Sequence, residues 1–239
     1  MRLPFFYKYD YKMSTFKLWL YVLILKMFKI NKLCYNYYTT KFLGIKSEVF
    51  ASNTMEGQKM QEDLELINRF LSGEMEAFEM LVRKYQNRVI NTAYSLAGNV
   101  SDAEDIAQDT FLKIYHGLDS FKAQAKFSSW LYRITVNTAY DFLRAHKYKA
   151  ESLEEADCEN IRAKENNPDL LTRELIQGAL KEIPFDFRSV LTLREIEGLS
   201  YEEISQALKI NIGTVESRLF RARKILKGIL TKKGVLKNV

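Results

Sequence analysis

The stretch Leu199–Leu226, LSYEEISQALKINIGTVESRLFRARKIL, decides the fold of the C-terminal part of the chain. Its Ser200 and Glu203 have the spacing of a capping box, in which each side chain bonds a free amide of the first helical turn. A short helix is therefore expected, followed by a turn over residues 209–213 and a longer helix over 214–230. A short helix, a tight turn and a longer helix are the layout of a helix-turn-helix.

The longer helix of this unit has one apolar side and one basic side. The apolar side, predicted to face the first helix, carries Val215, Leu219, Ala222 and Leu226. From residue 212 to the end of the chain there are eight Lys and Arg residues against one acidic residue, Glu216. Such a helix can enter a major groove, where side chains near its start contact base edges and later cations contact phosphates. A basic surface helix of an ordinary bundle is the alternative, but the turn, the capping box and the charge together favour DNA binding. The residues on the remaining arc are Ser217, Arg218, Phe220, Arg221 and Lys224.

Composition sets the broad class of the protein. The 239 residues are 47% hydrophobic and 28% charged, with only 3 Pro and 10 Gly, which is typical of a folded globular chain rather than a linker-rich one. Two cysteines and two histidines exclude a disulfide scaffold and a Cys/His zinc cluster. Residues 1–54 hold 9 basic and 2 acidic groups, whereas the rest of the chain holds 27 and 28, so a polyanion must be bound by a local patch.

Residues 1–54 form an atypical extension rich in Tyr, Phe and Lys. Their longest uncharged apolar run, residues 18–25, is shorter than the roughly 20 residues that a membrane-spanning helix needs. We interpret the segment as upstream sequence read through in frame, or as disordered, with the working protein beginning at Met55 or Met60. An interfacial basic-aromatic anchor is the alternative. Stable membrane insertion is not expected.

Residues 55–146 are predicted to form a first helical domain. Helix-ending glycines are expected at Gly73 and Gly98, and a capping box at Ser101 and Glu104 is expected to start a third helix. A loop over 118–128 then precedes a helix over 129–145. The inward positions expected in the four helices are Leu64, Ile67, Phe70 and Leu71; Phe78, Leu81, Val82, Tyr85, Val89 and Ala93; Ile106, Thr110 and Ile114; and Leu131, Ile134, Thr138 and Phe142.

Residues 147–169 are predicted to be a flexible acidic linker, since residues 150–160 contain five acidic groups and no basic one. Residues 170–239 then form the second domain, which contains the helix-turn-helix. The sequence thus predicts an all-α protein of two small helical domains joined by this linker.

The segment 121–144 interleaves aromatic and basic residues in a loop that leads into a helix. Exposed rings can stack on unpaired bases while nearby cations hold the backbone. Asn137 and Asp141 lie one turn apart and can meet the same ligand edge. Trp130, Ile134 and Phe142 are explained at least in part as core residues. Phe127, Arg133, Asn137 and Asp141 are harder to explain in that way. The candidate set for nucleic-acid contact is Lys122, Phe127, Ser129, Trp130, Arg133, Asn137 and Asp141.

A third set, Asp105, Gln108 and Asp109, forms an acidic stripe at i, i+3 and i+4. On spacing alone a solvated face explains it better than a docking site. Carboxylates without a fixed loop geometry indicate no metal site. No catalytic set is present either, because neither His116 nor His146 has a nucleophile at a suitable spacing, so no enzymatic activity is expected.

Residues 60–232 resemble bacterial sigma factors of the extracytoplasmic-function (ECF) class, which retain only the second and fourth conserved regions. The resemblance is carried, in order, by DAEDIAQDTFLKIY (102–115), FSSWLYRITVNTAYDFLR (127–144) and EGLSYEEISQAL followed by GTVESRLFRARKIL (197–226). Two positions depart from many relatives: Glu216 replaces a basic residue and Asp141 replaces Asn.

The resemblance implies a role for each set. The stripe Asp105, Gln108 and Asp109, with Phe111, is expected to dock on the clamp helices of the largest RNA polymerase subunit. The loop 119–129 is expected to capture a base flipped out of the promoter's minus-ten element, and the candidate set of segment 121–144 to contact that element. The final helix is expected to read the minus-thirty-five element through Thr214, Ser217, Arg218, Phe220, Arg221 and Lys224.

The expected protein is a dissociable, cytoplasmic initiation subunit that binds core RNA polymerase, recognises both promoter elements and melts the downstream one. Its expected partners are core RNA polymerase, promoter DNA and an anti-sigma factor, with no cofactor, metal or small-molecule substrate. A stand-alone helix-turn-helix regulator that dimerises through its N-terminal helices is the alternative. A membrane-anchored scaffold that uses residues 1–54 is a third possibility.

Overall fold

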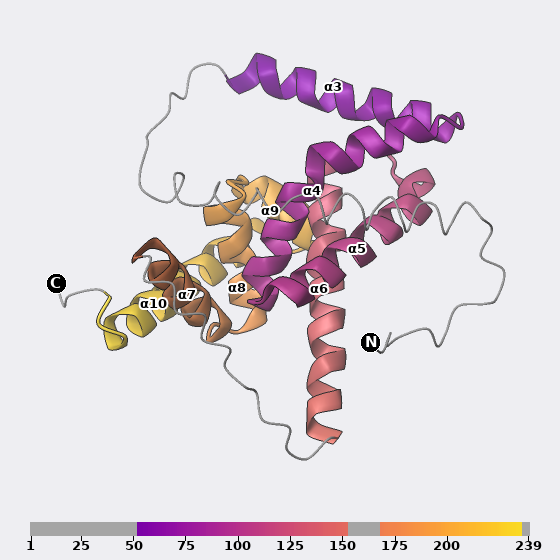
Figure 1. The fold of residues 1–239 in the computed structure, drawn as a ribbon. Coiled ribbons are helices and arrows are strands. Elements are labelled where there is room, and N and C mark those ends of the chain that lie inside the picture. The colour runs from indigo at the N-terminus through magenta and orange to yellow at the C-terminus, as the bar shows by residue number, and fades with distance from the viewer. Residues whose placement is uncertain (1–51, 153–167, 236–239) are drawn as a thin grey trace. The chain divides into compact units, whose positions relative to one another are not determined.

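The computed structural model describes residues 52–152 and 168–235, which are helical and contain no strand (Figure 1). The all-α prediction is confirmed. Most of the predicted linker and all but the last three residues of the predicted extension, which begin α3, lie outside the described residues. None of the helices that the structure describes is long and apolar enough to cross a membrane.

The described helices form two groups in chain order. The first group is α3 (Ser52–Leu71), α4 (Met75–Ala97), α5 (Val100–Gly117), a 3-10 turn (Leu118–Ser120) and α6 (Phe127–Ser152). The second group is α7 (Pro168–Lys181), α8 (Phe185–Leu191), a π-helical turn (Thr192–Ile196), α9 (Tyr201–Leu208) and α10 (Ile212–Lys232).

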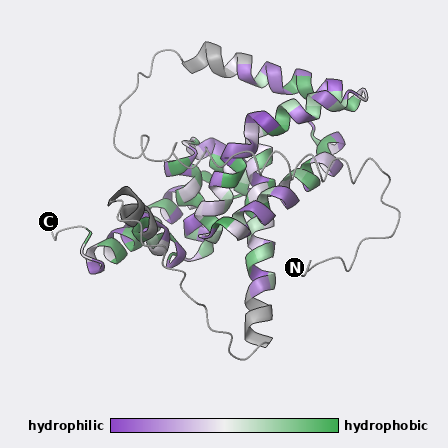
Figure 2. Cartoon of the chain, in the orientation of Figure 1, coloured by the Kyte–Doolittle hydropathy of each residue, from purple (hydrophilic) through white to green (hydrophobic). Residues whose placement is uncertain are grey.

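The core of the first group is built on α4, which packs against α3, α5 and α6. Apolar and polar residues alternate along the helices with the helical repeat (Figure 2), and such a stripe buries one face of each helix. Gly98 ends α4 in the left-handed region, at φ 84°, as its position after the last apolar residue predicts. All six predicted inward positions of this helix are buried: Phe78, Leu81, Val82, Tyr85, Val89 and Ala93.

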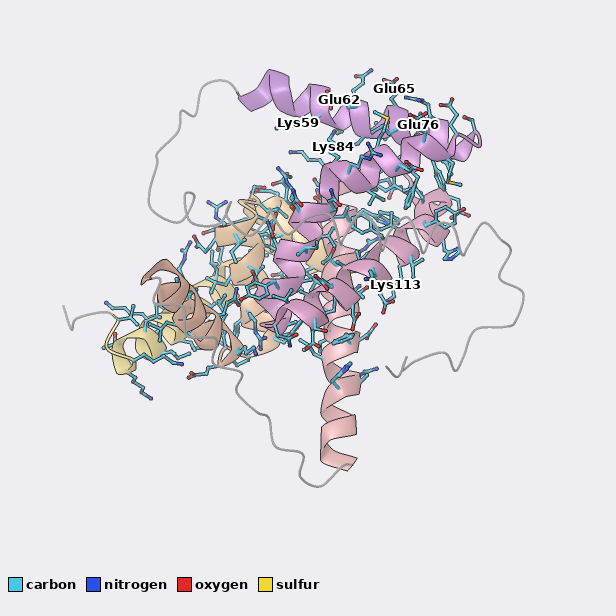
Figure 3. All side chains as sticks on the ribbon, in the orientation of Figure 1. Lys59, Glu62, Glu65, Glu76, Lys84 and Lys113 are labelled. Carbon is cyan, nitrogen blue, oxygen red and sulfur yellow. The ribbon has the colours of Figure 1, made fainter. Side chains whose placement is uncertain are left out.

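Helix α3 is held to α4 by polar contacts as well as by packing. Lys84 Nζ lies 3.0 Å from Glu62 Oε2, on the neighbouring helix (Figure 3). It also lies 2.9 Å from Asp63 Oδ1, and Tyr85 OH donates to Asp63 Oδ2 at 2.6 Å. Burial, reinforced by the neighbouring Asp63 carboxylate, raises the pKa of Tyr85. The prediction that Leu71 faces inward is wrong, since this side chain is 49% exposed at the end of the helix.

Helix α5 begins two residues before the position that the predicted cap implies. Asn99, and not Ser101, is the N-cap, and its Oδ1 accepts the amide of Asp102 at 2.8 Å. Asn caps a helix about as well as Ser does, so Asn99 can take the capping position in place of Ser101 and start the helix two residues earlier. The predicted inward residues Ile106, Thr110 and Ile114 are all buried.

Helix α6 begins at Phe127, two residues before the predicted start, and extends to Ser152, into the predicted linker. Leu131 and Thr138 are buried as expected, whereas Ile134 and Phe142 are only half-buried. The buried face is broader than a single stripe because α6 packs against α4, α5 and α9. The additional buried residues are Tyr132, Thr135, Val136 and Ala139.

The helix-turn-helix is present with a corrected turn. The capping box of Ser200 and Glu203 forms as predicted. Lys209, at φ 53°, supplies the left-handed residue of the turn, and Asn211 caps α10, so Gly213 lies inside the first helical turn rather than in the connection. Lys here adopts a backbone conformation that is uncommon for a residue with a side chain. The buried residues of α10 are Val215, Leu219 and Ala222, and the helix packs against both α8 and α9.

Candidate nucleic-acid interface

The outer arc of α10 is the most clearly developed candidate surface. Phe220 is 70% exposed, and Ser217, Arg221 and Lys224 are also exposed. A large apolar ring held in water on a helix whose other face is buried suggests a binding surface rather than a packing role. These residues share an arc because the buried positions Val215, Leu219 and Ala222 fix the rotation of the helix.

Two other predicted residues of α10 are already engaged within the domain. Arg218 Nη2 bonds Asp186 Oδ2 at 3.0 Å, and the hydroxyl of Thr214 donates to Asn211 Oδ1 at 2.7 Å. Both side chains are half-buried. The Asp186 carboxylate is 62% exposed, and an ion pair with such a partner contributes little free energy, so the Arg218 guanidinium can exchange this carboxylate for a phosphate at small cost.

The loop before α6 and the start of that helix hold a cluster of aromatic rings. Phe127 lies 5.3 Å from the ring of Tyr85, 5.7 Å from Phe121 and 5.8 Å from Trp130, measured between ring centroids. Phe127 is only 2% exposed, so it belongs to the core in this structure. Phe121 and Trp130, whose centroids are 5.5 Å apart, are half-buried and form the outer part of the cluster.

The remaining predicted residues of this segment divide by exposure. Ser129 is buried, Arg133 is half-buried, and Lys122 is exposed beside the ring cluster. Asn137 and Asp141 are exposed one turn apart on α6. The sequence-based candidate set omits Phe121, although its place in the aromatic-basic segment is a usable signal.

The acidic stripe lies on the outer side of α5. Asp105 and Asp109 are exposed and Gln108 is half-buried, while Phe111 points into the core. Partial loss of water raises the pKa of both carboxyl groups, and the neighbouring Asp102 adds to the shift at Asp105. Lys113 opposes the shift at Asp109. The stripe is thus an acidic surface whose carboxylates carry their charge at a cost in free energy, chiefly because they are partly withdrawn from water.

No group of His, Cys, Asp and Glu side chains in residues 52–152 and 168–235 has the geometry of a metal site.

Comparison with known proteins decides the family. The family model for Sigma-70 region 2 matches residues 81–148, and the model for Sigma-70, region 4 matches residues 173–226. The ECF RNA polymerase sigma-E factor of Escherichia coli K12 is 38% identical over 178 residues, which cover 69% of this chain and 92% of that protein. The chain belongs to the ECF class of the sigma-70 family. The RNA polymerase sigma-H factor of Pseudomonas aeruginosa is 34% identical, covering 70% of this chain and 92% of that protein.

Solved structures of sigma factors resemble this ECF sigma factor in fold. CnrH, in complex with the cytosolic domain of CnrY, has a TM-score of 0.55 and 28% identity, covering 72% of this chain and 98% of that one. The sigma factor RpoE, in complex with the anti-sigma factor NepR from Bartonella quintana, has a TM-score of 0.53 and 25% identity, covering 66% and 98%. The predicted sigma-factor function is confirmed. The region 2 match includes α5 and most of α6, and the region 4 match includes α9 and most of α10.

Proposed function

We propose that this sigma factor contacts promoter DNA through two surfaces and core RNA polymerase through a third. The observation that carries the proposal is that α10 has one buried face and one exposed face. One face of that helix is locked into the domain by Val215, Leu219 and Ala222, and the opposite arc offers Phe220 and Arg221 to solvent. This arc is assigned to the minus-thirty-five element, with Thr214, Ser217, Arg218 and Lys224 around it.

The minus-ten element is assigned to the loop before α6 and the outer face of that helix. Asn137 and Asp141 contact base edges, while Lys122 and Arg133 hold the backbone. Phe121 and Trp130 supply ring surface for an extruded base. Phe127 and Ser129 are buried, so we assign them the role of supporting the conformation of the loop from the core side.

The α5 stripe is assigned to the binding of core RNA polymerase; its residues are Asp105, Gln108 and Asp109. The carboxylates are exposed and partly desolvated, a state in which a basic partner surface relieves the cost of their charge. Phe111 positions the stripe from within the core.

The protein is proposed to act in the cytoplasm with the polymerase, without catalysing a reaction of its own and without a cofactor or small-molecule substrate. An anti-sigma factor is a proposed partner, because the two similar sigma structures described above are complexes with CnrY and with the anti-sigma factor NepR. A stand-alone helix-turn-helix regulator explains α10 alone, but it does not explain the match of both sigma regions.

The test of the minus-thirty-five assignment is in vitro transcription with core polymerase and Arg221→Ala. A good side-chain contact to a base is worth about 1–3 kcal/mol, so we expect activity to fall about fivefold or more on a promoter with an intact minus-thirty-five element. The matched control is Arg223→Ala on the same helix, because Arg223 is bonded to Glu195 at 2.6 Å and faces the domain. Equal losses for both variants contradict the assignment of the arc.

The test of the minus-ten assignment is promoter opening, measured by permanganate reactivity of unpaired thymines, with Asn137→Ala. We expect reduced opening with unchanged polymerase binding. Asn68→Ala, at an exposed position of α3, is the control. Unchanged opening with Asn137→Ala contradicts the assignment of this face.

A further inference from the structure

The two groups of helices, which lie in one compact unit, touch through a half-buried carboxylate, that of Glu197. Glu197 follows the π-helical turn of the second group. Its Oε1 accepts the hydroxyl of Thr92 on α4 at 3.0 Å, and its Oε2 accepts the hydroxyl of Tyr132 on α6 at 2.6 Å. Thr92 and Tyr132 are both fully buried. Hydrogen bonds to a charged group are stronger than those between neutral groups, and here both donors are shielded from water.

A second acidic residue makes a parallel contact. Lys126 Nζ, in the loop before α6, lies 2.8 Å from Glu203 Oε1 in the first turn of α9. The guanidinium of Arg188 on α8 also donates to the carbonyl of Leu96 near the end of α4. The second group is therefore bound at both α4 and the loop that precedes α6.

The second group of helices also contacts the face of α6 that is assigned to the minus-ten element. Tyr140 lies between Asn137 and Asp141, and its ring centroid is 5.3 Å from that of Phe185 on α8. Lys126 belongs to the loop expected to capture an extruded base. The second group thus engages residues beside those that must meet DNA.

This arrangement is incompatible with binding both promoter elements at once. The two elements are separated by about 25 base pairs, or roughly 85 Å at 3.4 Å per base pair. Hydrogen bonds of 2.6–3.0 Å between the two groups cannot persist while each group sits on its own element. The groups have to separate before the protein can act.

We propose that these contacts form an autoinhibitory latch, made of Glu197 with Thr92 and Tyr132 and of Glu203 with Lys126. The latch closes the free protein and opens when it binds polymerase and promoter. The proposal rests on the proposed function, because only a two-element sigma factor has to separate its domains. If only open molecules bind core polymerase, the apparent affinity is the intrinsic affinity multiplied by the fraction of molecules that are open. Weakening the latch increases this fraction and therefore raises the apparent affinity for core polymerase.

Carbodiimide crosslinking of the full chain tests the closed geometry directly, because the reagent condenses an amine and a carboxylate, with loss of water, when they are in contact. Mass spectrometry is expected to find a Lys126–Glu203 crosslink in the free protein and to lose it in the complex with core polymerase and promoter. Two ion pairs inside the separate groups serve as internal controls and persist in both samples: Lys84–Glu62 at 3.0 Å and Lys233–Glu182 at 2.7 Å. Formation of both control crosslinks without Lys126–Glu203 in the free protein overturns the latch. So does a Lys126–Glu203 crosslink that survives in the promoter complex.

A pair of Tyr→Phe variants tests the inhibitory effect. Tyr132→Phe removes one latch bond and keeps the buried ring, and Tyr85→Phe removes an equivalent 2.6 Å bond to Asp63 within the first group. We expect Tyr132→Phe to bind core polymerase about tenfold more tightly than the unaltered protein, and Tyr85→Phe to bind as the unaltered protein does. Equal affinities for the two variants contradict the latch. Failure of every form to bind polymerase contradicts the proposed function instead, and the crosslink in the free protein still decides the closed geometry.

Discussion

Replacing Phe127 with Ala separates a structural role from a DNA-contacting one. The side chain is 2% exposed and touches the rings of Tyr85, Phe121 and Trp130. Truncating a buried Phe costs about 3–5 kcal/mol through lost burial and the cavity that remains. A domain is stable by only about 5–15 kcal/mol, so Phe127→Ala is expected to remove a large share of that margin.

Urea unfolding followed by circular dichroism measures this change. We expect a loss of about 3–5 kcal/mol in the free energy of unfolding and a fall in Tm of roughly 6–20 °C. Phe220→Ala is the matched control, because the same truncation at a 70% exposed position is expected to change stability by less than about 0.5 kcal/mol. If Phe127→Ala is as stable as Phe220→Ala, the ring is not a core residue, and the expectation of an exposed stacking platform is restored.

Three further changes probe a cap, an ion pair and the acidic stripe. Asn99→Ala is expected to cost about 1 kcal/mol in urea unfolding and Ser101→Ala less than half of that, because Asn99 is the residue that caps α5; a reversed order contradicts the assigned cap. Burial tends to raise the pKa of Glu203, but the hydrogen bond from Lys126 and the backbone bond at Ser200 outweigh it and leave the pKa lowered. The stabilisation is therefore complete above the ordinary value of 4.5 and is lost as pH falls through the lowered one, so the unfolding midpoints of the unaltered protein and Glu203→Gln should differ at pH 7 and converge in acid. Asp109→Asn is expected to leave stability at pH 7 unchanged or higher, since the pKa of Asp109 is raised, while weakening polymerase binding in a pull-down; unchanged binding contradicts the docking role.

Local patterns predicted much of this fold. The capping box of Ser200 and Glu203 involves residues three apart, and the inward face of α4 follows from the helical repeat, so both could be obtained without knowing any distant neighbour. The exposed arc of α10 follows for the same reason, since the buried positions fix the orientation of that helix. The order of the three family motifs then predicted the sigma class.

Features that depend on distant residues could not be predicted in this way. Tyr132 and Glu197 are 65 residues apart, and Thr92 and Glu197 are 105 apart, so no local period relates them. The burial of Phe127 depends on Tyr85, which belongs to another helix. Near a helix start, the sequence alone does not determine whether an aromatic residue turns inward or toward a ligand.

The central claim is that this chain directs initiation by core polymerase. Run-off transcription with sigma-free bacterial core polymerase, the full chain and DNA from just upstream of the protein's own gene tests it most directly, because such genes often drive their own promoters. We predict a discrete transcript that requires both proteins, together with binding of the chain to core polymerase. A protein that fails to bind core polymerase, gives no transcript and instead binds a palindromic DNA site tightly by itself would contradict the claim.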